Sequence, residues 1–265
     1  MKTKTCLVTG ASGGIGSAIA KALDKQGYKV ILQGRNESKL GVLKQQLGPE
    51  TRIVAGDLTD LVEREKVLQE VFKQGAVDLL VNAAGISLFS AFETTSNQQL
   101  QQMLETNLLA PMLFTQGFIE HANKVSYDDS SDKVQIINLG SAFGYIGYPG
   151  FSSYCATKFG LRGFTESLAR EYSGSRFTFG YFAPRATRTD INSKQVDEMN
   201  KALGNSVDSV EYVAEQFIDF LRTKKREAVV GWPEKLFVKV NTWLPKIVDN
   251  AIGAKLATIK QYMHP

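Results

Sequence analysis

The chain has 265 residues, of which 43% are hydrophobic and 22% are charged, an ordinary composition for a globular protein. A formal net charge of +4 is mild for this length, and no Lys/Arg run is interleaved with aromatic residues, so we expect no nucleic-acid binding. The two cysteines, Cys6 and Cys155, are too few for a disulfide framework and are expected to be free thiols in a reducing compartment.

Short apolar segments alternate along the chain with amphipathic segments of helix length. The predicted strands are residues 6–10, 29–34, 52–57, 77–85, 134–141, 177–184 and 228–232. The predicted helices are roughly 14–26, 36–47, 60–74, 97–122, 152–173 and 208–223. Continuous apolar strands between helices are typical of a parallel sheet covered on both faces, with ligands bound at the carboxyl edge. We therefore predict a single α/β domain, a Rossmann-like doubly wound sheet of about seven strands over residues 1–231.

Other segments have no catalytic pattern. The polar stretch 123–133 is expected to be an exposed connection, and residues 232–265 are expected to form an amphipathic helical extension. No run of eighteen apolar residues occurs, and the N-terminal residues lead into a strand without a secretory signal. We expect no transmembrane span, no metal site and a cytoplasmic location.

A glycine-rich turn, TGASGGIG (residues 9–16), stands between the first predicted strand and the first helix. Glycines there let the backbone approach a pyrophosphate, and the helix start offers free N–H groups. The spacing differs from G-x-G-x-x-G and, taken alone, also fits a simple turn. Its order between strand and helix predicts dinucleotide binding through Gly10, Ser12, Gly13, Gly14, Ile15 and Gly16.

Residues after the second, third and fourth strands predict which cofactor is bound. Gly34 replaces the carboxylate that would accept from an NAD ribose, and Arg35 follows it, so we predict NADPH, unless Arg35 is only a solvated loop residue. Asp57, followed by Leu58, is a candidate for contacting adenine or for capping the next helix. Asn82, Ala83 and Gly85 end the fourth strand with small residues that suit a close approach to the cofactor or a tight turn.

Tyr154 and Lys158 lie one helical turn apart, so the ammonium of Lys158 is expected beside the Tyr154 ring. A phenol with a pKa near ~10 is a poor acid-base group at neutral pH, and a nearby positive charge is expected to lower that pKa. Ser141 supplies a hydroxyl that could hold a substrate oxygen while Tyr154 exchanges a proton with it.

Taken together, these motifs resemble the single-domain short-chain dehydrogenases/reductases from about residue 4 to 232. The matching pieces are TGASGGIG (9–16), Asp57, NAAG (82–85), Asn107, Ser141, YCATK (154–158) and the segment after the sixth strand. The resemblance implies that Tyr154 is the general acid in reduction and that Lys158 lowers its pKa and binds the nicotinamide ribose. It also implies that Ser141 holds the substrate carbonyl oxygen and that Asn107 sits at a helix distortion carrying a water to Lys158.

The same resemblance implies that Pro184, Thr187 and Thr189 contact the cofactor, and that the protein is a homodimer or homotetramer associating through helices 97–122 and 152–173. One departure is Arg185, where the family usually has glycine. We expect it to point to solvent or, alternatively, to reach into the cleft toward an anionic substrate group or the cofactor phosphates.

The remaining segments concern the substrate. Phe143, Tyr145, Tyr148 and Phe151, with Leu88, Phe89 and Phe92, are expected either to line an apolar pocket or to pack against helices or a partner subunit. Residues 191–205 stand where family members carry a lid, and here they are polar. The extension repeats apolar residues at helical spacing before and after Pro245 with a net positive charge. It either packs on its own domain or a partner, covers a long apolar substrate, or contacts a membrane surface.

These observations predict an NADPH-dependent reductase of a carbonyl in a fairly hydrophobic small molecule, such as a 3-oxoacyl, steroid-like or lipid ketone. Alternatives are an NAD-dependent alcohol dehydrogenase acting oxidatively, and a dinucleotide-sensing protein that has lost catalysis. The second of these would be expected to lack Tyr154 or Lys158, and both are present.

Overall fold

Parallel strands form the sheet of the computed structural model, which describes residues 3–127, 133–223 and 225–263. Within these ranges, seven strands pair in the order β3-β2-β1-β4-β5-β6-β7, and every neighbouring pair is parallel. The strands are β1 Thr5–Val8, β2 Lys29–Gly34, β3 Arg52–Ala55, β4 Leu79–Asn82, β5 Val134–Leu139, β6 Phe177–Ala183 and β7 Glu227–Val229. The predicted fold class is confirmed; residues 128–132 of the predicted connection lie outside the described residues.

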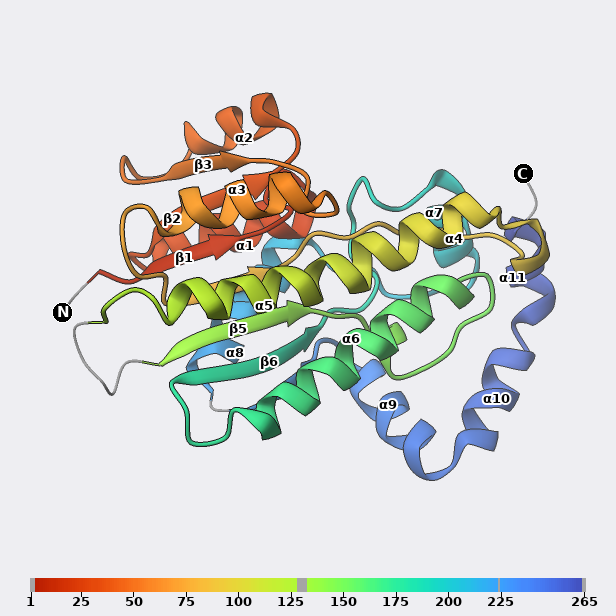
Figure 1. Ribbon diagram of the computed structural model, residues 1–265. Helices are drawn as coiled ribbons and strands as arrows, with labels where there is room; N and C mark the ends of the chain where they lie inside the picture. The colour runs from red at the N-terminus through yellow and green to blue at the C-terminus, as the bar shows by residue number, and fades with distance from the viewer. Residues whose placement is uncertain (1–2, 128–132, 224, 264–265) are drawn as a thin grey trace.

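Helices cover both faces of the sheet (Figure 1). In β1, Cys6 and Val8 pack toward one group of helices and Leu7 toward the other, and all three side chains are fully buried. The first group contains α1 Gly14–Lys25, α2 Glu37–Lys44 and α8 Val210–Arg222; the second contains α3 Leu61–Phe72, α5 Ala110–Ala122 and α6 Ser152–Glu171. Because helices cover both faces of the sheet, its strands appear in the sequence as continuous runs of apolar residues.

The strand order reverses between β1 and β4, which pair although the chain visits β2 and β3 between them. The connections leaving these two strands run to opposite sides and so open a crevice at the carboxyl edge of the sheet. The glycine turn follows β1, and residues 83–85 follow β4. The fold thus places two of the predicted cofactor segments side by side.

The predicted helix 97–122 is interrupted in its middle. It consists of α4 Asn97–Leu104, a π-helical turn over Glu105–Leu109 and α5. Pro111 has no N–H to donate to the carbonyl of Asn107 four residues earlier, so the α-helical pattern cannot continue there. The distortion that the resemblance implied is therefore present, with Asn107 at its centre.

Residues 232–263, which we call the C-terminal arm, form α9 Glu234–Trp243, α10 Pro245–Gly253 and α11 Leu256–Met263. In Figure 1, α9 and α10 form a V whose turn points away from the sheet, and α11 returns toward α7 Lys194–Ala202. Val238, Val248 and Ile259 face inward and are buried. The single helix expected after Pro245 is thus two helices, because the chain leaves the helical path after Gly253.

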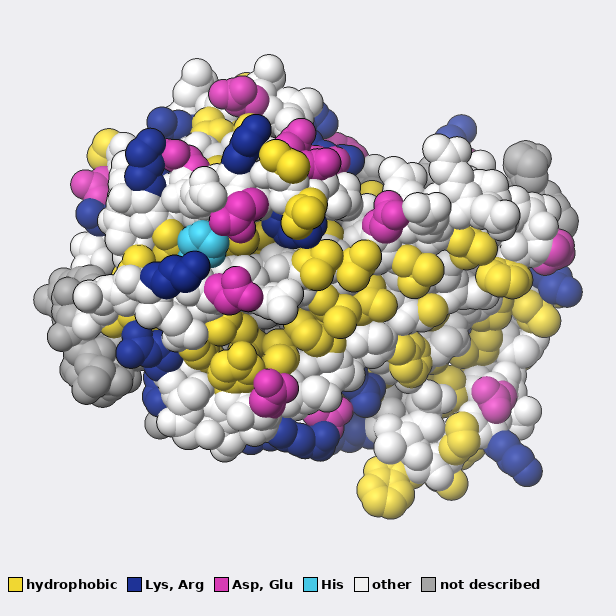
Figure 2. Space-filling model, viewed as in Figure 1, with side chains coloured by type: hydrophobic (Ala, Val, Ile, Leu, Met, Phe, Trp, Pro, Cys, Tyr) yellow, Lys and Arg dark blue, Asp and Glu magenta, His cyan; other side chains and the backbone are white. Residues whose placement is uncertain are grey.

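Hydrophobic side chains gather in a band over α4, α5 and α6 on the face shown in Figure 2. Leu104 of α4, Leu109 of the π-helical turn and Phe159 of α6 are each more than two-fifths exposed. Short 3-10 turns, Phe92–Thr94 and Ala142–Gly144, lie in the loops after β4 and β5. Cys6 and Cys155 are both buried free thiols, as expected.

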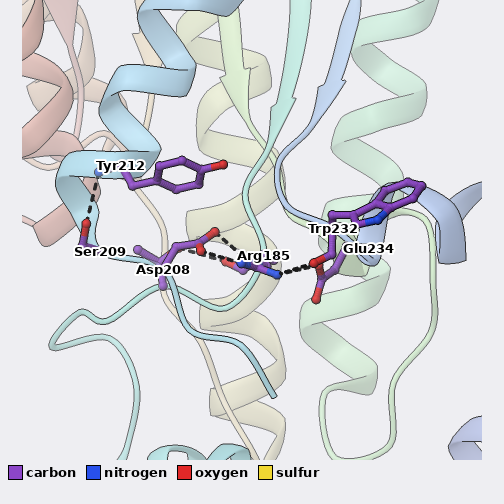
Figure 3. A network of polar contacts seen from close by, with 7 residues as sticks. Arg185, Asp208, Ser209, Tyr212, Trp232 and Glu234 are labelled. Atoms are coloured by element: carbon purple, nitrogen blue, oxygen red, sulfur yellow. Dashed lines mark hydrogen bonds and ion pairs between the residues drawn. The ribbon is translucent and has the colours of Figure 1, made fainter. Parts of the chain in front are cut away.

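Arg185 joins three segments that are distant in the sequence (Figure 3). Its Nε and Nη2 donate to the two carboxylate oxygens of Asp208, at 2.9 and 2.7 Å, just before α8. Its Nη1 donates to Glu234 Oε2 and to the Trp232 carbonyl, both at 3.0 Å, where the arm begins. The Arg185 side chain is only 13% exposed. The expectation that Arg185 points to solvent is therefore wrong. The side chain does line the cavity at the carboxyl edge of the sheet, its hydrogen bonds tie the arm to the domain, and its contact with an anionic ligand stays a prediction.

Replacing Arg185 with Gln is expected to lower the free energy of unfolding by about 2–4 kcal/mol, since the nearly buried Asp208 carboxylate then loses its cationic partner. Urea unfolding measures this change, and limited proteolysis of the arm should become faster. The exposed Arg188 offers a matched control, and Arg188→Gln should change stability by less than about 0.5 kcal/mol. Equal stabilities for the two variants would contradict the tethering role.

Candidate active site

A cavity of about 640 Å³ lies at the carboxyl edge of the strands and gathers nearly all the predicted site residues. Those lining it are Gly10, Ser12, Gly13, Gly14, Ile15, Gly16, Arg35, Asp57, Leu58, Asn82, Ala83, Gly85, Ser141, Tyr154, Lys158, Pro184, Thr187 and Thr189. Asn107 is the predicted residue that lies behind the wall, with 1% of its surface exposed. One hollow therefore contains both the glycine turn and the Tyr154–Lys158 pair.

The glycine turn brings two backbones together. Gly10 has a φ of 61°, and a Cβ there would lie 2.6 Å from Ala84 Cα, in the segment after β4. A Cβ at Gly16 would lie 2.4 Å from the Gly10 carbonyl oxygen. Only glycine fits at these two positions. The start of α1 consequently presents its N–H groups to the cavity without intervening side chains, which suits a pyrophosphate.

Thr189, which lines the same cavity, also supports dinucleotide binding. A Cβ at Gly14 would lie 2.7 Å from Thr189 Cγ2, so Thr189 covers the first turn of α1. Its buried Oγ1 has no hydrogen-bond partner within the protein, and a buried hydroxyl is normally paired. Thr187, in contrast, donates its hydroxyl to the Arg185 carbonyl. The orphaned Thr189 hydroxyl and the glycine cradle fit a bound dinucleotide.

Arg35 and Asp57, predicted separately, lie together at the ends of β2 and β3. Arg35 Nη1 is 3.6 Å from Asp57 Oδ2, and the arginine side chain is 65% exposed. Burial alone would raise the pKa of Asp57, but hydrogen bonds from Thr59 and the charge of Arg35 together lower it. Asp60, not Asp57, caps α3, which removes the helix-cap alternative for Asp57.

Lys39 is a cavity residue that the sequence reasoning missed. It stands in the first turn of α2, where Asn36 accepts from its backbone N–H. In the sequence, its position four residues after Arg35 could have indicated a second cation near the same strand end. A second cation thus lies at the edge of the cavity where Arg35 is found.

Asn82 lines the cavity, as its predicted place near the cofactor requires, but its side-chain amide is hydrogen-bonded inside the domain. Its Nδ2 donates to Thr115 Oγ1 at 3.0 Å and to Asn138 Oδ1 at 2.8 Å, inside the domain. Asn138 in turn donates to Thr165. The side chain therefore joins β4 to β5 and α5, while its backbone contributes to the cavity wall.

Tyr154 lies in an aromatic environment, with its ring centroid 6.4 Å from that of Phe143 and 6.3 Å from that of Phe151. Burial raises the pKa of its phenol to about 12, and a hydrogen bond with Ser141 opposes this only in part. The sequence predicted a lowered pKa, and for the protein chain by itself that prediction is wrong. The phenol is consequently protonated at neutral pH, as a proton donor must be.

Lys158 is buried, and its Nζ donates to the Leu139 carbonyl at 2.9 Å. The ammonium lies 5.6 Å from the Tyr154 ring centroid, so the two side chains do share one helical face as predicted. Burial lowers the pKa of Lys158 to about 8. Burial disfavours the charged form of each group, the ammonium of Lys158 and the phenolate of Tyr154. The pKa of Lys158 therefore falls and that of Tyr154 rises.

Ser141 is held by a residue that the sequence reasoning did not select. Tyr181, fully buried in β6, accepts from the Ser141 N–H at 3.3 Å and donates to the Lys158 carbonyl at 3.1 Å. One phenol thus fixes the backbones of both candidate catalytic residues. In the sequence Tyr181 is one aromatic residue among several in a strand, so no local signal marks it.

Asn107 pairs with the peptide of Ile86 in both directions. Its Nδ2 donates to the Ile86 carbonyl and its Oδ1 accepts from the Ile86 N–H, each at 2.8 Å. A Cβ on Gly85 would lie 3.2 Å from Asn107 Oδ1 and 3.8 Å from Lys158 Nζ. Asn107 therefore positions the segment after β4 next to Lys158. The water relay implied by the resemblance stays a prediction.

The substrate side of the cavity is largely apolar, although Asn200, Asn205 and Lys255 are also among its lining residues. Phe143, Tyr148 and Phe151 of the aromatic loop line it, whereas Tyr145 packs under α6 and donates to Glu227. Leu88, Phe89 and Phe92 do not line it; Phe89 packs on Phe151 instead. The segment 191–205, polar by composition, forms a helix that turns Val196 and Met199 inward, and the arm adds Phe237, Val248, Ala251 and Ile252.

Comparisons with known proteins agree with this arrangement. The chain matches the short chain dehydrogenase family over residues 4–200. It is 33% identical over 232 residues to the 3-oxoacyl-(acyl-carrier-protein) reductase FabG of Rickettsia bellii, covering 86% of this chain and 92% of that protein. It is 35% identical over 202 residues to nodulation protein G of a Rhizobium species, covering 76% and 80%.

Solved structures share the fold. A short-chain dehydrogenase from Streptomyces avermitilis superposes with a TM-score of 0.79 at 24% identity, covering 98% of each chain. A variant of actinorhodin polyketide ketoreductase, solved with NADPH, gives a TM-score of 0.74 at 26% identity and covers 86% of this chain and 95% of that one. The chain belongs to the short-chain dehydrogenase/reductase family and is an oxidoreductase of that family.

Proposed function

We propose that the protein reduces the carbonyl group of a hydrophobic ketone or aldehyde with NADPH. The observation that carries the proposal is that Tyr154, Ser141 and Lys158 line one cavity together with aromatic and aliphatic side chains. A phenol with a pKa of about 12 retains its proton at neutral pH and can release it to an alkoxide, which is a much stronger base.

When bound, the dinucleotide would supply the hydride. The glycine turn, Thr189 and Asp57 would hold it along the carboxyl edge of the sheet. The hydroxyls of Ser141 and Tyr154 would hold the substrate oxygen, and Tyr154 would deliver the proton as negative charge develops there. Lys158, charged below its pKa of about 8, would favour the phenolate left on Tyr154.

NADPH is proposed because two cations, Arg35 and Lys39, lie at the cavity edge beyond β2. A ribose phosphate would be paired by both, whereas the strand end offers no carboxylate to accept from a ribose hydroxyl. Asp57 already contacts Arg35, and this contact would weaken when a phosphate competes for the guanidinium.

The proposed substrate class follows from the wall opposite the glycine turn. It is built from aromatic residues of the loop before Tyr154, from the inner face of α7 and from the arm. Such a surface favours a lipid-like or acyl chain over a small polar ketone. The similarity to a 3-oxoacyl-(acyl-carrier-protein) reductase of Rickettsia bellii supports 3-oxoacyl compounds within that class.

We also propose that the protein is a homodimer or homotetramer that associates through α5 and α6. The hydrophobic band over α4, α5 and α6 in Figure 2 supports this assembly, and so does the exposure of Leu104, Leu109 and Phe159 on these helices and the turn between α4 and α5. A contiguous exposed apolar surface of this kind is typical of an interface.

Replacing Tyr154 with Phe removes the proton donor and retains the ring. The rate constant kcat for reduction of a 3-oxoacyl thioester should fall by about 10²–10⁴-fold, while the Kd for NADPH should change little. Steady-state kinetics and a fluorescence titration measure the two. Tyr148→Phe, on the same cavity wall, is the matched control and should retain turnover. Undiminished turnover by the Tyr154 variant would contradict the mechanism.

The rate should also depend on the charge of Lys158. Because burial lowers its pKa to about 8, kcat/KM for reduction should decline above that pH as the ammonium is lost. The stability consequence has the opposite sign. Unfolding restores an ordinary lysine that binds its proton more tightly, so this group's contribution to stability rises with pH above 8. Lys158→Met should abolish both trends, and a wild-type kcat/KM that stays flat at alkaline pH would exclude this role.

Cofactor choice should change when the cations beyond β2 are removed. Arg35→Ala combined with Lys39→Ala should raise the KM for NADPH by about 10–100-fold and leave the KM for NADH within a few fold. The exposed Lys44, at the other end of α2 and outside the cavity lining, is the control site. A wild-type enzyme that binds NADH more tightly than NADPH would overturn the assignment.

A further inference from the structure

The turn between α9 and α10 exposes large apolar side chains to an unusual extent. Trp243 is 81% exposed, Leu244 57%, Ile247 54% and Leu236 46%. We call residues 235–247 the arm tip. In Figure 1 this turn lies at the bottom of the view and points away from the sheet, and Figure 2 shows hydrophobic side chains protruding there. The arm tip is therefore convex and apolar.

The exposure is not explained by the packing of the arm, because its inner face is already used. Val238 and Val248 are buried, and Phe237, Val248 and Ile252 line the cavity. Arg185 holds the beginning of α9, and Ile259 of α11 is buried against the domain. Anchored at both ends, the arm cannot turn Trp243 and Leu244 inward without leaving these contacts.

Positive charges surround the apolar residues. Lys235, Lys239 and Lys246 are exposed on the arm tip, whose residues 235–247 include no acidic side chain. The neighbouring Glu234 is paired with Arg185. Apolar side chains that include a tryptophan, with lysines beside them, are the features of segments that rest in the interfacial layer of a membrane.

We propose that the arm tip docks on an anionic lipid surface, with Trp243 and Leu244 entering the interfacial layer and the lysines pairing with lipid phosphates. Lysines near an anionic surface add electrostatic attraction to the burial of the apolar side chains. Among the described residues no helix is long and apolar enough to cross a membrane, so the arm would lie on the surface. A second copy of the chain fits the tip poorly, because a two-fold contact would bring two convex, lysine-bearing surfaces together.

The geometry has a consequence for the cavity. Phe237 and Leu236 are neighbours on α9 in the arm tip; both are exposed, and Phe237 also lines the cavity. If the arm tip docks, the part of the cavity wall that the arm forms would lie next to the lipid. The docking itself does not depend on the proposed reaction.

The test uses the full-length protein with Trp232 replaced by Phe, which leaves Trp243 as the one tryptophan of the chain. This protein is mixed with vesicles of phosphatidylcholine containing phosphatidylglycerol, or of phosphatidylcholine alone. We expect co-sedimentation with the anionic vesicles, a blue shift of Trp243 emission, and weaker binding at high salt. Absence of sedimentation and of any emission shift would overturn the proposal.

Variants locate the contact. Trp243→Ser with Leu244→Ser should reduce vesicle binding at least about 10-fold, and Lys239→Glu with Lys246→Glu should abolish the preference for anionic vesicles. The matched control, Leu61→Ser with Val62→Ser, removes two exposed apolar residues of α3 and should bind like the parent protein. Thermal unfolding and NADPH binding verify that each variant is folded.

Two outcomes would contradict the assignment. Equal vesicle binding by the tip variants and the control would place the lipid contact elsewhere. Light scattering that shows self-association, lost in the Trp243/Leu244 variant, together with no vesicle binding, would identify a second copy of the chain as the partner.

Discussion

The close approach of the segments after β1 and β4 is the constraint on which the rest of the site depends. Gly10 lies against Ala84 with no space for a side chain, and Gly85 fits closely against Asn107, where a Cβ would lie 3.2 Å from Oδ1. This contact requires parallel strands whose carboxyl ends meet at one edge, and it occurs where the strand order reverses. The phosphate cradle and the Tyr154–Lys158 pair are therefore two ends of one crevice.

Burial decides the electrostatics of the pair. Desolvation raises the pKa of Tyr154, which keeps the phenol protonated, and lowers the pKa of Lys158, which makes the ammonium easier to deprotonate. The two effects act against each other, because a phenolate would be stabilised by the ammonium that burial disfavours. Proton transfer in such a site is driven by the charge that develops on the substrate oxygen rather than by a phenolate present beforehand.

The arm is tied to the domain through one largely buried arginine. Arg185 stands where family members usually have glycine, and its guanidinium links the segment after β6 to the starts of α8 and of the arm. That link fixes α9 and α10 over the substrate side of the cavity. Because the inner faces of α9 and α10 pack toward the cavity, their outer faces have no packing partner among the described residues.

The sequence by itself determined the strand and helix order, the glycine turn and the sharing of one helical face by Tyr154 and Lys158, because these features depend on local spacing and polarity. Tertiary structure alone decided the inward pairing of Asn82, the role of Tyr181 and the partners of Arg185, because the contacting residues are 23 or more positions apart in sequence. It also decided the pKa of Tyr154, because desolvation depends on what the fold packs around a group and spacing along the chain does not record it.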